Sequence, residues 1–284
     1  MNALMTNCDN CDYAKLKLTN RLALLGALLL IGLAMAGAVR AQGNKFISTN
    51  GTAPREKVAV GGTTRLGAGK IRSWAKTDGG KLTAIGVTFD ENALKDLPTE
   101  PPPGEEGTWH VLPVPAEAAN SVFTHILVNW NPRGHEPSKI YDIGHFDFHF
   151  YLMPEKDREA ITAKGDDTAR SYKALPADEM PNGYVVAPNS AVPAMGAHLV
   201  DPRSHEFHGK SFTKTFLYGI YDGRIIFLEP MITRDYLATK PNVTEELVLP
   251  TKFAKSGRYP TKYTVKYDPE TKEYTIALEG MVDR

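Results

Sequence analysis

The chain has 284 residues, and its 33 Lys and Arg balance its 33 Asp and Glu to give a formal net charge of zero. Without an excess of either sign, we expect neither nucleic acid nor an anionic membrane surface as a partner. The part after residue 41 is long enough to bury the core of one large all-β domain or of two small ones.

The N-terminal residues have the pattern of an export signal. A polar stretch with basic residues precedes an uncharged apolar run from Leu22 to Ala38, and Ala41 is a small residue directly before Gln42. We therefore predict that residues 1–41 are a signal peptide and that the mature protein is periplasmic or secreted, with no attachment to the membrane. The apolar run also fits an uncleaved anchor, because a membrane-spanning helix needs about 20 apolar residues.

Both cysteines, Cys8 and Cys11, precede the apolar run. A Cys-x-x-Cys pair can be a redox or zinc motif, but this pair lies in a segment that is expected to be removed or left in the cytoplasm. The mature chain then has neither a disulfide nor a thiol nucleophile. Any metal in it must be bound mainly by nitrogen and oxygen atoms.

After the signal, the pattern predicts a mainly β protein. Residues 42–54 are polar, as in a flexible leader, and residues 55–284 form the predicted single β-rich, metal-binding domain. Segments rich in β-branched and aromatic residues alternate with turns, which is typical of an antiparallel β-barrel or sandwich with few short helices. We expect strands over residues 57–62, 70–77, 82–89, 108–114, 122–130, 143–153, 212–221, 224–227, 262–267 and 273–278.

Asp222-Gly223, between two of these strands, is a strong hairpin signal. Because Pro230 cannot donate to a sheet ladder, we expect the second strand of the hairpin to end before it, with Glu229 at the rim of a sheet. Ligands are commonly bound at the mouths of β-barrels. Short helices are expected over residues 155–161, 233–238 and 244–247.

Residues 145–150 read His-Phe-Asp-Phe-His-Phe. In a strand, successive side chains point to opposite faces, so His145, Asp147 and His149 share one face and three phenylalanines share the other. A phenylalanine face buried in a core would hold the opposite face rigidly, as a metal site requires. The pattern predicts such a site.

Two later residues extend the predicted site. His198 follows a Pro/Gly turn, and Glu229 follows the hairpin strand. We predict that His145, His149, His198 and Glu229 bind one metal ion. Asp147 is a further candidate, either as a ligand or as a hydrogen-bond acceptor that orients a histidine, and His135 is expected near the mouth of the site.

The spacing of the strand histidines limits this prediction. Positions four apart are separated by roughly 13 Å at about 3.3 Å per residue, so one metal reaches both His145 and His149 only if the strand bends or bulges. In a flat strand, Asp147 with one of the two histidines is the alternative.

Imidazoles with one carboxylate suit zinc, manganese, iron or copper better than calcium or magnesium. An open coordination position would allow catalysis on a small molecule, with Asp147 or His135 in proton transfer, although no catalytic residue is assigned. The alternatives are a non-catalytic module that binds a metal or a small molecule, and a structural protein without metal, either of which can be a homo-oligomer.

Several ordered motifs resemble those of an uncharacterised family of exported bacterial proteins, a domain of unknown function. They are Asn129–Pro137, His145–Tyr151, Met195–Pro202, Thr215–Gly223 and Glu229–Thr233. This resemblance implies a class of protein and no particular reaction.

The site also loosely resembles that of germins and related cupins, in which a histidine strand is combined with a glutamate and a later histidine after a Pro/Gly turn. An α-type carbonic anhydrase is a second analogue, with two histidines on one strand and a third from another. In both families the paired histidines are two residues apart, whereas His145 and His149 are four apart.

Overall fold

The computed structural model describes residues 56–284, which all belong to one compact unit. The predicted signal peptide, the leader and both cysteines lie outside the described residues. Within residues 56–284, no helix is long and apolar enough to cross a membrane.

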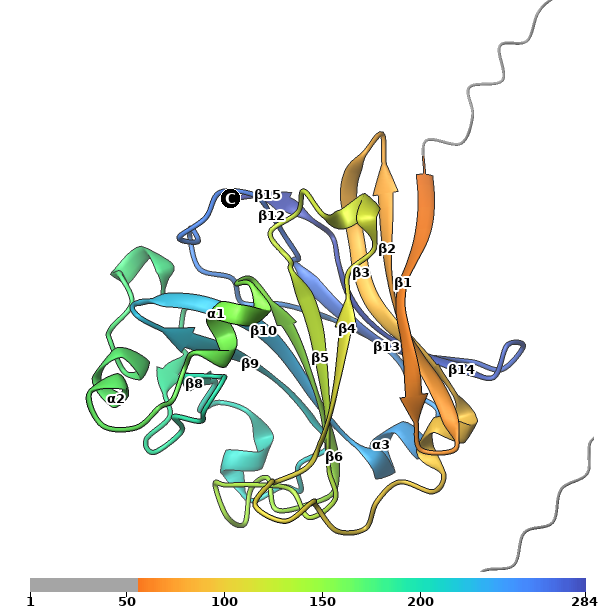
Figure 1. The fold of residues 1–284 in the computed structure, drawn as a ribbon, viewed down its shortest axis with the longest axis horizontal. Helices are drawn as coiled ribbons and strands as arrows, with labels where there is room; N and C mark the ends of the chain where they lie inside the picture. Colours follow the sequence, from red (N-terminus) through yellow and green to blue (C-terminus); the bar gives the residue numbers. More distant parts are fainter. Residues whose placement is uncertain (1–55) are drawn as a thin grey trace, which may run out of the picture. The chain divides into compact units, whose positions relative to one another are not determined.

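Two open antiparallel sheets make up most of the fold (Figure 1). The six-stranded sheet has the order β1 (Glu56–Leu66), β2 (Gly69–Asp78), β3 (Lys81–Asp90), β14 (Glu273–Glu279), β13 (Lys262–Asp268) and β11 (Asn242–Glu246). The seven-stranded sheet has the order β4 (Thr108–Pro113), β5 (His125–Asn131), β6 (His145–Tyr151), β10 (Arg224–Thr233), β9 (Lys214–Tyr221), β8 (Ala197–Val200) and β7 (Val185–Val186). A small third sheet pairs β12 (Arg258–Tyr259) with β15 (Val282–Asp283).

The two large sheets pack against each other through aromatic side chains. Phe89 of β3 stacks on Phe148 of β6 with ring centroids 6.3 Å apart. The ring centroids of Phe216 in β9 and Tyr263 in β13 are 5.3 Å apart. The mainly β prediction is therefore confirmed, and of its two forms the sandwich is the one found, because neither sheet closes on itself.

The three phenylalanines of β6 are fully buried in this core, as their alternation predicts. On the opposite face of the seven-stranded sheet lies the segment from α1 (Glu155–Glu159) through α2 (Asp166–Ser171) to β8, whose Ile161 and Met195 pack against Tyr151 and Phe227 of the sheet. In Figure 1 this segment is green to teal and lies on the far side from β1–β3. Both faces of β6 are consequently buried.

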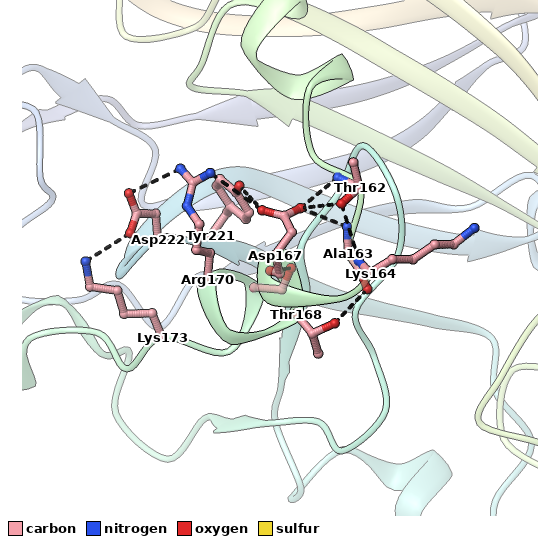
Figure 2. Close-up of polar contacts among 10 residues, drawn as sticks. Thr162, Ala163, Lys164, Asp167, Thr168, Arg170, Lys173, Tyr221 and Asp222 are labelled. Atoms are coloured by element: carbon pink, nitrogen blue, oxygen red, sulfur yellow. Dashed lines mark hydrogen bonds and ion pairs between the residues drawn. The ribbon is translucent and has the colours of Figure 1, made fainter.

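Asp167 anchors the covering segment (Figure 2). Its carboxylate accepts hydrogen bonds from the backbone N–H groups of Thr162 and Ala163, at 2.7 and 2.9 Å, and from the hydroxyl of Tyr221 in β9. Arg170 lies over the Tyr221 ring, 4.6 Å from its centroid. These contacts attach the loop before α2 to the seven-stranded sheet.

The strand β10 is longer than predicted and continues through Pro230 to Thr233. Its pairing with β6 skips Glu229 and Pro230, but the register on either side of the gap is the same. The missing N–H of proline thus interrupts one ladder locally without ending the strand, since Pro230 still pairs in register with Phe216 of β9. Glu229 lies inside the sheet and not at its rim.

The predicted helices at 155–161 and 233–238 correspond to α1 and α3 (Arg234–Ala238). The helix predicted over 244–247 is wrong, because this segment lies largely in β11 and pairs with β13. The β-branched Val243 and Thr244 suit a strand, and the Thr244 hydroxyl meets that of Thr264 at 2.9 Å across the pair.

Candidate metal centre

The strand β6 is regular, with an unbroken register against β5. Without a bulge, alternate residues on one face stay about 7 Å apart, and His145 and His149 do not come together. The ligand atoms of the candidate residues fall into two groups, and within each group the atoms lie within 4.8 Å of one another. Three of the four predicted ligands, His149, His198 and Glu229, form the first group. His145 lies in the second, with the two further candidates Asp147 and His135.

Glu229 is the centre of the first group. The neighbouring pairs, Leu228 with Phe150 and Met231 with Asp147, place it across from His149. The Nε2 atom of His149 lies 3.2 Å from Oε1 of Glu229, and the Nε2 atom of His198 lies 3.8 Å from Oε2. One carboxylate therefore faces two imidazoles that come from different strands.

The backbone holds the His198 ring in one orientation. Its Nδ1 lies 2.8 Å from the carbonyl oxygen of Ser190, and its amide donates to the Ser190 hydroxyl at 3.0 Å. A carbonyl oxygen only accepts hydrogen bonds, so Nδ1 carries the proton and Nε2 of the neutral ring presents a lone pair toward Glu229. Histidines that bind metals commonly have this arrangement.

Phe227 packs against both imidazoles of the first group, with ring centroids 4.9 Å from His149 and 5.5 Å from His198. Gly219 makes this possible, because a Cβ atom there would lie 2.0 Å from the Phe227 ring. The absence of a side chain at Gly219 thus allows the aromatic ring to support both histidines.

The second group is built around Asp147. Its Oδ1 lies 3.1 Å from Nε2 of His145, and its Oδ2 lies 3.5 Å from Nε2 of His135. Asn131 of β5 donates its amide hydrogen to Oδ2 at 2.6 Å. His135 comes from the loop between β5 and β6 and is the one partly exposed member of this group.

Burial and neighbouring charges shift the pKa values of several residues in the two groups. Burial alone would raise the pKa of Asp147, but the adjacent His145 and His135 hold it well below its usual range. Burial lowers the pKa of His149 and the Glu229 carboxylate more than offsets this, so the net shift is upward. For His198 burial dominates and the pKa is lowered. For His135 the Asp147 carboxylate outweighs burial and raises the pKa to about 9.

Several buried atoms of the two groups make no hydrogen bond, although they lie close to groups of opposite character. They are Nε2 of His149, Oε2 of Glu229, Nε2 of His145 and Oδ1 of Asp147. A buried polar atom left without a partner costs about 1–3 kcal/mol. A cation between the imidazoles and the carboxylates would give these atoms a partner, so both residue sets fit a metal.

Five of the six residues, all but His145, line one cavity of about 290 Å³. Its described lining includes the acids Glu106, Glu136, Asp147 and Glu229, and no lysine or arginine. Trp109, Met195 and Leu217 are among its apolar lining residues. The negative potential of such a cavity attracts cations.

Asn131 and Ser190, which hold Asp147 and His198 in place, were not among the residues predicted from the sequence. The sequence did contain a signal for Asn131, because Asn129 and Asn131 alternate with apolar residues in a strand that is otherwise mostly apolar. Ser190 lies in a loop and carries no such pattern. His125 is also buried on β5, but it belongs to neither group. Its ring stacks on that of Tyr151, with the ring centroids 4.6 Å apart.

In comparison with known protein families, residues 77–130 match the TTHB210-like family, described as "Hypothetical protein TTHB210". No curated protein and no solved structure matched the chain. The matching segment ends before His135 and contains none of the six residues of the two groups, so it carries no information about their chemistry. Over residues 77–130 the chain is similar to an uncharacterised family.

Proposed function

We propose that this protein is exported to the periplasm or the cell exterior and binds one divalent transition metal ion, zinc, manganese, iron or copper, through His149, His198 and Glu229. The convergence of these three ligand atoms within 4.8 Å, on strands of one sheet, is the observation that carries the proposal. Two imidazoles and one carboxylate suit these metals. Residues 1–41 support the export by their pattern alone.

The proposed activity is that of a metal-dependent enzyme on a small molecule in the cavity. Three protein ligands leave coordination positions unfilled, as in catalytic rather than structural sites. His149, His198 and Glu229 all line the cavity, so those positions face it. A bound metal ion would supply Lewis-acid or redox chemistry there. Ser190 and Phe227 orient the imidazoles, and Trp109 and Met195 offer a substrate apolar contacts.

Metal analysis of the purified protein tests this proposal. After the metal-free protein is reconstituted with Zn²⁺, His149→Ala and His198→Ala should each lose one bound equivalent relative to the original chain. His208→Ala is the matched control, because His208 is exposed and belongs to neither group. Full retention of metal in a folded His149→Ala variant would contradict the proposal.

A further inference from the structure

We propose that His135, His145 and Asp147 bind a second divalent cation, so that one cavity holds two neighbouring metal sites. This inference goes beyond the site proposed above and depends on none of its ligands. It rests on the orientation of three buried or half-buried side chains around the Asp147 carboxylate.

The His145 ring presents a lone pair to a carboxylate. Its Nδ1 lies 2.6 Å from the carbonyl oxygen of Ile143, which only accepts hydrogen bonds, so Nδ1 carries the proton. In the neutral ring Nε2 is then an acceptor, and it lies 3.1 Å from Oδ1 of Asp147, which is also an acceptor. Two lone pairs at this distance repel each other unless a cation or a proton lies between them.

A metal ion suits this geometry. Nε2 of His145 and Oδ1 of Asp147 lie 3.1 Å apart, and neither has a well-aligned hydrogen-bond partner. A metal ion needs no linear arrangement between the two atoms, because each can approach it along its own lone pair. His145 is completely buried and Asp147 is 3% exposed, so water has little access to hydrogen-bond with the pair.

His135 completes the set in the same orientation. Its Nδ1 lies 2.7 Å from the carbonyl oxygen of Glu136, which leaves Nε2 directed at Oδ2 of Asp147, 3.5 Å away. Asn131 donates a hydrogen bond of 2.6 Å to the same oxygen, Oδ2, so the position of the carboxylate is fixed before any cation binds. The second site thus has two imidazoles and one carboxylate, and suits the same metals as the first.

The two sites are neighbours on β6. Asp147 and His149 point from the same face two positions apart, a separation of about 7 Å in a flat strand. Both side chains line the same cavity. A small molecule in that cavity would reach both cations.

Equilibrium dialysis of the metal-free protein against Zn²⁺ tests the second site. We expect two tightly bound equivalents in the original chain and one in Asp147→Asn, which keeps the size of the side chain. His135→Ala, in a loop and partly exposed, should weaken the second equivalent at least 10-fold and guards against misfolding of core variants. A single equivalent that a folded Asp147→Asn variant retains, or two equivalents in that variant, would overturn the inference and leave a protonated histidine beside the carboxylate.

The two proposals fail separately. If the original chain binds one equivalent, which His149→Ala retains and Asp147→Asn loses, the first site is wrong and the second stands.

Discussion

His149 and Glu229 lie opposite each other on β6 and β10, with Nε2 and Oε1 3.2 Å apart. The pair depends on the register of the sheet, because a shift by one residue would turn Glu229 toward the phenylalanine core. The packing of Phe146, Phe148 and Phe150 therefore also determines which groups meet on the opposite face. The same sheet that forms the core positions the candidate ligands.

Replacing Glu229 by Gln should weaken the affinity for Zn²⁺ by more than about 100-fold, since even outer partners of metal ligands are worth about 10- to 100-fold. The amide keeps the size of the side chain but loses its charge, so the melting temperature of the metal-free protein should change little. Titration of the two proteins side by side measures the effect. The control is Glu117→Gln, because Glu117 is an exposed acid that does not line the cavity. Equal affinities would remove Glu229 from the site.

Replacing Gly219 by Ala should displace the Phe227 ring, because the new Cβ would lie 2.0 Å from it. We expect a loss of about 1–3 kcal/mol in the free energy of unfolding, as for other overpacked cores, together with weaker metal binding. Denaturant unfolding and Zn²⁺ titration give the two quantities. The double variant Gly219→Ala/Phe227→Leu should recover part of the stability, and no recovery would mean that the clash lies elsewhere.

Asp167 should contribute stability that depends on pH. Its pKa is lowered to about 2, chiefly by the hydrogen bond from Tyr221. A depressed carboxyl pKa stabilises the fold above the unfolded value of about 3.9, and this contribution is lost as the pH falls from about 5 to 2. We expect Asp167→Asn to lose about 1–2 kcal/mol at pH 7 and to show a smaller decline in stability toward acid. Its exposed neighbour Asp166, changed to Asn, is the control. Parallel pH profiles for the original chain and Asp167→Asn would contradict this prediction.

The export signal should be cleaved after Ala41, as the apolar run and the small residue at its end indicate. N-terminal sequencing of the exported protein is expected to find Gln42 first. Recovery of intact Met1 on membrane-bound protein would instead favour the anchor.

The sequence by itself determined the strand character and the facing of β6. The alternation of His145, Asp147 and His149 with three phenylalanines is a local property, since neighbouring residues of any strand point to opposite sides. For the same reason the Asp222-Gly223 hairpin and most strands were found in advance. The mainly β class followed from these local patterns.

Only the tertiary structure decided how the candidate ligands are grouped. A flat β6 keeps His145 and His149 apart, and the long-range pairing of β6, β10, β9 and β8 brings Glu229 and His198 to the second of them. Pro230 predicted the end of a strand, yet β10 continues because pairing on both sides of the gap stabilises it. The choice of a sandwich over a barrel was likewise decided by the tertiary structure. Register and sheet closure depend on contacts between residues far apart in the chain, which local patterns of residue type do not specify.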